Sequence, residues 1–70
     1  MRYREAARKL IRLGCIEEPR RGPGAHRKWL NPANQHRTVL PDHGGKDLRL
    51  GTLRAAIRQL GLDWGNFQRA

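Results

Sequence analysis

The sequence predicts a small α+β domain in which two helices cover one face of a three-stranded antiparallel sheet. Two segments with helical periodicity flank a central region of short stretches separated by Gly, Pro and Asn turns. A chain of 70 residues is long enough for one domain with a thin core. We therefore expect residues 1–70 to form a single two-layer domain of element order α-β-β-β-α.

The first helix is expected to begin near Tyr3. Its apolar positions recur at the spacing of one helix face, and they are Tyr3, Ala6, Ala7, Leu10 and Ile11. Gly14 supplies the left-handed conformation that commonly ends a helix. Cys15 is the single cysteine, so neither an intrachain disulfide nor a cysteine-based zinc site is possible within the chain. It is predicted to be a small buried apolar side chain.

Three short strands are expected over residues 15–18, 25–30 and 37–40, with turns at residues 20–24 and 31–34. Alternation in the middle strand places His26, Lys28 and Leu30 on one face. Arg27 and Trp29 then lie on the opposite face, together with Ala25. Trp29 is therefore predicted to be a core residue, while the face that carries His26 stays open.

A second helix is expected from the recurrence of apolar residues at Leu53, Ala56, Ile57 and Leu60. Gly51 or Thr52 is expected to cap its start, and Gly61 its end. Residues 63–70 form a short C-terminal extension in this interpretation. Asp63 is expected to cap one last turn there, with Trp64 and Phe67 covering the edge of the core.

Charge indicates the class of partner. Lysine and arginine outnumber aspartate and glutamate by 15 to 6, which gives a formal net charge of +9. Self-repulsion at that density is relieved by a polyanion or an acidic protein, and arginine, the commoner cation here, suits bidentate contact with phosphate. No apolar run approaches the length of a signal peptide or a membrane span, so we expect a cytoplasmic protein.

Two groups of residues suggest a family. Residues 41–54 run from Pro41 through His43, Lys46-Asp47-Leu48 and Gly51-Thr52-Leu53-Arg54, and a helix ending in Gly61-Leu62 follows. Upstream, Gly24-Ala25-His26 is followed three residues later by Trp29. Over residues 3–67 the chain resembles the HicA toxins, small ribonucleases of bacterial and archaeal toxin–antitoxin pairs. The resemblance implies a fold like that of double-stranded-RNA-binding domains, with which the expected element order also agrees.

The resemblance further implies an activity, a catalytic residue and a partner. HicA toxins cleave mRNA without a metal, and the histidine after Gly-Ser is their catalytic residue, which makes His26 the candidate here. Ala25 stands where the family has that serine, so no hydroxyl lies beside His26. A HicA-like toxin implies a HicB-like antitoxin, which we expect to cover His26 and Lys28.

Metal-free cleavage of RNA is chemically accessible to these residues. The 2′-hydroxyl is an internal nucleophile, and a histidine can take or give the necessary proton. Lys28 is placed to contact the phosphate. Further candidates for RNA contact are Arg27, Arg20, Arg21, Lys46 and His43. No cofactor is expected, and the spacing of the three histidines matches no common metal-ligand pattern.

Other functions are compatible with the same residues. One is a non-catalytic RNA-binding module that holds duplex RNA by its shape. Another is a basic interaction subunit of a larger ribonucleoprotein. A DNA-binding role is a third, although no recognition helix with base-reading residues is evident beyond Gln59. An unpaired edge strand also leaves a homo-oligomer open.

Overall fold

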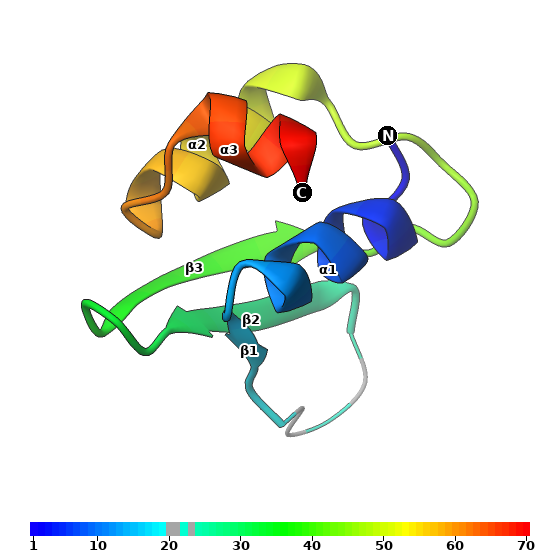
Figure 1. Ribbon diagram of the computed structural model, residues 1–70. Helices are drawn as coiled ribbons and strands as arrows, with labels where there is room; N and C mark the ends of the chain where they lie inside the picture. The colour runs from blue at the N-terminus through cyan, green and yellow to red at the C-terminus, as the bar shows by residue number, and fades with distance from the viewer. Residues whose placement is uncertain (20–21, 23) are drawn as a thin grey trace.

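The computed structural model describes residues 1–19, 22 and 24–70, and its helices lie along one face of a single sheet (Figure 1). The elements are α1 (Tyr3–Arg12), β1 (Ile16–Glu17), β2 (His26–Asn31), β3 (His36–Pro41), α2 (Leu50–Gln59) and α3 (Trp64–Arg69). The strands form an antiparallel sheet in the order β1-β2-β3. The predicted α+β class with a three-stranded antiparallel sheet is confirmed.

Helix α1 is amphipathic, but its buried face is narrower than the sequence pattern suggested. Tyr3, Ala6 and Leu10 are buried. Ile11 is 63% exposed, so its assignment to the core face was wrong. It follows Leu10 directly, and one residue step turns the side chain about 100° around the helix axis, away from the sheet.

The end of α1 is a hydrogen-bonded glycine cap. Gly14 has φ 90°, as predicted. Its N–H donates to Ile11 O at 3.0 Å, and the N–H of Cys15 donates to Leu10 O at 2.9 Å. This is the Schellman arrangement, which satisfies two carbonyls that the helix leaves without partners. It turns the chain directly into β1, with Cys15 buried as expected, and that burial raises the pKa of the Cys15 thiol.

The register of β2 against β3 assigns a side to every residue of the two strands. Trp29 pairs with Thr38 and Arg27 with Leu40 on the helix side, where Trp29, Thr38 and Leu40 are buried. Lys28 pairs with Val39 on the opposite side, which we call the outer face. The predicted alternation in this strand, with Trp29 in the core, is therefore confirmed.

Helix α2 begins at Leu50, before either of its expected caps. Its N-cap is Arg49 in an extended conformation, and no side chain caps it. The expected capping by Gly51 or Thr52 was wrong, because both residues lie inside the helix. The other end is as predicted, with φ 70° at Gly61.

The turn between β2 and β3 is attached to the end of α2. The side-chain amides of Asn31 and Asn34 both donate to Leu60 O, at 2.8 and 3.0 Å. A Cβ at Gly61 would collide with the Asn34 amide. The positive φ therefore favours glycine at this position, and any larger residue would displace the Asn34 amide from Leu60 O.

Helix α3 closes the helical layer. Its Phe67 side chain is fully buried, and Asp63 caps the helix by accepting from Asn66 N at 3.0 Å, as expected. The ring of Trp64 stacks on Phe67 with the centroids 5.5 Å apart. Lys9 of α1 donates to the carbonyl of Gln68 at 2.7 Å. Residues 63–70 thus contribute a core side chain rather than only a surface turn.

Candidate functional site

The outer face of the sheet carries His26 and Lys28. Both side chains are exposed, and they lie two residues apart on β2. That spacing separates their Cα atoms by roughly 7 Å. Across the ladder, His26 pairs with Pro41 and Lys28 with Val39, so neither side chain faces a charged residue on β3. Within the part of the chain that the structure describes, Lys28 has no ion-pair partner.

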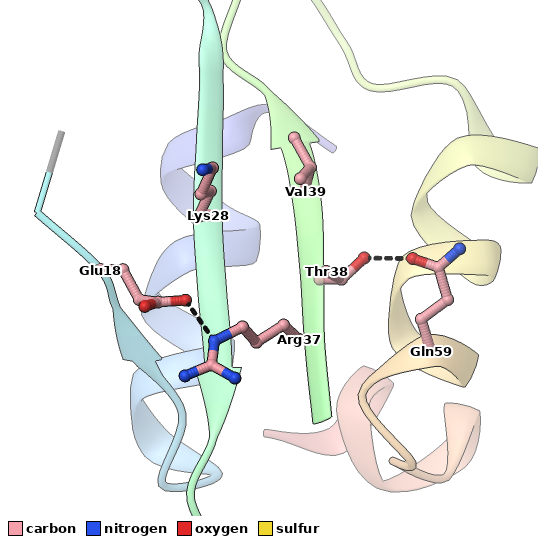
Figure 2. A pocket seen from close by; sticks show the side chains of 6 residues that line it. All are labelled: Glu18, Lys28, Arg37, Thr38, Val39 and Gln59. Carbon is pink, nitrogen blue, oxygen red and sulfur yellow. Dashed lines mark hydrogen bonds and ion pairs between the residues drawn. The ribbon is translucent and has the colours of Figure 1, made fainter. Parts of the chain in front are cut away.

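A groove of about 540 Å³ runs from Glu18, just after β1, across the outer face and over the edge of β3 to α2 (Figure 2). Its lining residues are Glu18, Lys28, Arg37, Thr38, Val39 and Gln59. Arg37 Nε donates to Glu18 Oε1 at 2.9 Å. At the opposite end, the buried Thr38 hydroxyl donates to Gln59 Oε1 at 2.6 Å. The groove therefore combines one charge-neutral ion pair, one free cation and one oriented amide.

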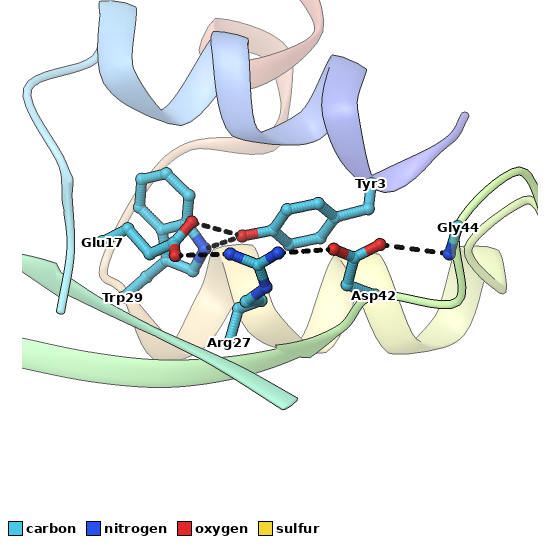
Figure 3. A network of polar contacts seen from close by, with 6 residues as sticks. All are labelled: Tyr3, Glu17, Arg27, Trp29, Asp42 and Gly44. Carbon is cyan, nitrogen blue, oxygen red and sulfur yellow. Dashed lines mark hydrogen bonds and ion pairs between the residues drawn. The ribbon is translucent and has the colours of Figure 1, made fainter. Parts of the chain in front are cut away.

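The helix side of the sheet holds a polar network centred on Arg27 (Figure 3). Its guanidinium donates to Glu17 Oε2 at 2.9 Å and to Asp42 Oδ2 at 3.0 Å. The hydrogen bond to Glu17 raises the pKa of the Arg27 guanidinium. Contact between Arg27 and RNA, which the sequence suggested, would require these pairs to break. In the structure, Arg27 bridges Glu17 and Asp42.

Tyr3 completes the network from α1. Its hydroxyl donates to Glu17 Oε1 at 2.7 Å and accepts from Trp29 Nε1 at 3.1 Å. Burial, and after it the hydrogen bond to Glu17, raise the pKa of the Tyr3 phenol well above its ordinary value of 10.0. This network was not predicted from the sequence, where its one signal was the placement of Arg27 on the same strand face as Trp29.

The loop that follows β3 returns to the start of β2. Asp42 N donates to Ala25 O, and Asp42 Oδ1 accepts from Gly44 N at 3.1 Å. His43 is therefore held at the end of the sheet where His26 begins β2, and its side chain is exposed. Lys46 is exposed further along the same loop.

Two expected RNA contacts, Arg20 and Arg21, lie outside the described residues. Among the residues that are described, no group of three or more His, Cys, Asp or Glu side chains is placed to hold a metal ion. The helices found in the described ranges include none long and apolar enough to cross a membrane.

Comparison with known families gives the chain its identity. Residues 3–62 match the family described as the HicA toxin of bacterial toxin–antitoxin pairs. The chain belongs to the HicA toxin family. No curated protein and no solved structure matches it.

The family match confirms the resemblance stated from the sequence. It makes this HicA protein the toxin of a toxin–antitoxin pair, so an antitoxin partner follows from membership. The matched range includes His26, Lys28 and the whole sheet, and it ends before α3. In this HicA chain, the buried Phe67 is thus supplied by a helix beyond the matched residues.

Proposed function

We propose that this HicA toxin is an endoribonuclease that cleaves single-stranded mRNA without a metal ion, with His26 as general acid or base. The observation that carries the proposal is the placement of His26 and Lys28 side by side on the open face of β2. That placement leaves both side chains accessible to a polyanion. The chain's net charge of +9 favours such a partner.

The chemistry uses groups that the RNA and this face supply. The 2′-oxygen attacks the adjacent phosphorus, and the bond from phosphorus to the 5′-oxygen breaks. The products are a 2′,3′-cyclic phosphate and a 5′-hydroxyl. His26 takes the 2′-proton or gives one to the leaving oxygen, and such proton transfer contributes about 10²–10⁴-fold to the rate. The Lys28 ammonium stabilises the charge that develops on the phosphate oxygens.

Position 25, where the family has serine, belongs to the opposite side of the strand from His26. Ala25 is half-buried, and its carbonyl accepts from the N–H of Asp42. The Asp42 carboxylate points to Arg27 on the helix side. A serine hydroxyl at position 25 would therefore lie away from the outer face. We expect the change Ala25→Ser to alter the cleavage rate by less than about 3-fold, which corresponds to less than one neutral hydrogen bond.

We further propose that an acidic, HicB-like antitoxin covers His26 and Lys28. The outer face offers cations for charge complementarity and exposed apolar side chains at Ile16 and Val39, 53% and 45% exposed. Burial of His26 would exclude RNA from the site. A structure of the complex with both His26 and Lys28 open to solvent would overturn this proposal. Association of two copies through an edge strand stays a prediction.

The deciding experiment is incubation of the protein with unstructured RNA in EDTA, with wild type beside His26→Ala. We expect cleavage by the wild type alone, with 2′,3′-cyclic phosphate ends. The matched control is His36→Ala, because His36 is also exposed but lies at the opposite end of the β2–β3 ladder. Salt-sensitive binding by wild type and His26→Ala without cleavage would instead favour the non-catalytic RNA-binding module.

A further inference from the structure

The groove on the outer face has a composition unlike that of a phosphate site. Of the two cations that line it, Arg37 is paired with Glu18, whose carboxylate would repel a phosphate, and Lys28 alone is left for an anion. The side chain of Val39 adds an apolar surface to the groove, and Figure 2 shows it on β3 beside Lys28 of β2. A neutral, planar group with apolar faces and a polar edge fits such a surface better than an anion does.

The polar end of the groove is oriented in advance. Thr38 is 4% exposed, and its hydroxyl donates to Gln59 Oε1 at 2.6 Å. This hydrogen bond orients the Gln59 amide through its oxygen. The Nε2 group of the amide has no hydrogen-bond partner among the described residues. Two N–H donors are therefore available at the groove. Lys28 Nζ supplies further donors on the same outer face.

From this arrangement we propose that the groove is a nucleobase-binding subsite of the RNA site, an inference that rests on the proposed function. An unstacked base lies over Val39, and the Gln59 Nε2 group donates to a carbonyl oxygen or ring nitrogen on its edge. Single-stranded RNA exposes such edges, which are the usual targets of sequence-specific recognition. Thr38 acts as a positioning residue because it orients the Gln59 amide.

Lys28 connects this subsite to the reacting centre. It lines the groove and stands two residues from His26 on the same strand face. A base bound in the groove would therefore place its own phosphate beside Lys28 and His26. Because the base site adjoins the reacting centre, we expect a preference for one base at a fixed position near the cut. Cations that contact only the RNA backbone would not produce a base preference.

The test reads base preference without requiring cleavage. The catalytically silenced variant His26→Ala is mixed with a pool of random RNA octamers, and bound molecules are sequenced. We expect one base position to be enriched about 3- to 10-fold, the value of one net neutral hydrogen bond. Adding Gln59→Ala should abolish that enrichment. Adding Gln68→Ala, which changes an exposed glutamine on α3, should leave it intact.

A second variant sharpens the result. Gln59→Glu keeps the oxygen that accepts from Thr38 but replaces the N–H donors by an acceptor. The preferred base should then change to one that presents an amino group at the same edge. The added negative charge should lower affinity for all octamers alike, so the ratio between bases is the quantity to compare.

Each outcome decides the subsite separately from the nuclease activity. Absence of enrichment in the His26→Ala protein, or enrichment that survives Gln59→Ala, would overturn the subsite and leave the groove to a protein partner. Absence of cleavage by the wild-type protein would overturn the proposed function. It would not alter the binding result, since the octamers are never cut in that experiment.

Discussion

The Arg27 guanidinium lies 3.0 Å from the Asp42 carboxylate, and this ion pair joins the two backbone segments that carry His26 and His43. Arg27 directly follows His26, and Asp42 directly precedes His43. The other oxygen of Asp42 accepts from Gly44 N at 3.1 Å, which holds the loop in its turn. A pair on the covered side of the sheet thus links the segments that present His26 and His43.

Loss of the Asp42 charge is expected to lower both thermal stability and cleavage. The substitution Asp42→Asn keeps the shape but removes one of the two carboxylates around Arg27. The control is Asp63→Ala, which removes the side-chain cap of α3 far from the histidines. Both variants should unfold at a lower temperature than wild type. Only Asp42→Asn should cleave RNA more slowly at a temperature where both are folded, and equal rates would contradict the positioning role.

The phenol of Tyr3 should resist ionisation in the folded protein. Its pKa is raised above 10.0 by burial and the hydrogen bond to Glu17, so the stability that the neutral phenol contributes is present below pH 10 and is lost as the pH rises above it. Tyr3 is the single tyrosine, which allows its ionisation to be followed by ultraviolet absorbance. We expect phenolate absorbance only together with unfolding. Its appearance near pH 10 in folded protein would contradict the buried network.

Removal of the Tyr3 hydroxyl should lower the free energy of unfolding, although only one oxygen atom is lost. In Tyr3→Phe, Glu17 Oε1 loses a donor and Trp29 Nε1 loses its acceptor. Leaving such groups unsatisfied costs about 1–3 kcal/mol, measured as the free energy of unfolding in urea. The effect should vanish above the pH at which the wild-type phenol ionises. A change below about 0.5 kcal/mol, the lower limit for one hydrogen bond, would show that water replaces the hydroxyl.

Helix α3 should be essential for stability although it lies beyond the matched residues. Phe67 is fully buried, and truncation of a buried Phe to Ala costs about 3–5 kcal/mol. Phe67→Leu, which removes fewer buried atoms, should cost less than Phe67→Ala. Chemical denaturation of both variants checks this expectation. Equal and small effects would mean that α3 packs only loosely on α1 and α2.

RNA affinity should fall steeply with salt. Five phosphate contacts on a single strand predict a slope of about −3.5 in log affinity against log salt concentration. Lys28→Met should reduce the magnitude of that slope by about 0.7. Arg69→Met is the control, because Arg69 lies on α3, away from the outer face. A slope near zero for wild type would contradict electrostatic binding of RNA.

The sequence predicted the elements well because their signals are local. Helical spacing identified Leu10 and Ile57 as core residues, and strand alternation identified Trp29 as one. The positive φ at Gly14 and Gly61 was expected because each glycine follows the end of a helix. Exposure of Ile11 was not predictable, since the width of a buried helix face depends on what packs against it. The start of α2 was not predictable either, because no side chain caps it at Arg49.

The polar contacts of the site depend on the alignment of strands and helix, so most of them could not be predicted from the sequence. Arg27 meets Glu17 and Asp42 across 10 and 15 residues, respectively. Thr38 meets Gln59 across 21 residues. Pairs so distant in sequence come together only through the particular alignment of strands and helix, which single-residue propensity does not encode. By contrast, the shared face of His26 and Lys28 follows from alternation alone.

The six consecutive paired positions between β2 and β3 have a consequence for the timing of toxin control. A surface built on a continuous ladder, with its turn held by Asn31 and Asn34, exists before any partner arrives. An antitoxin that docks there spends little conformational entropy on ordering this part of the toxin. Differences in affinity among antitoxin variants should then appear mainly as differences in residence time. The delay before a freed toxin reaches RNA would be governed by how long the antitoxin stays bound.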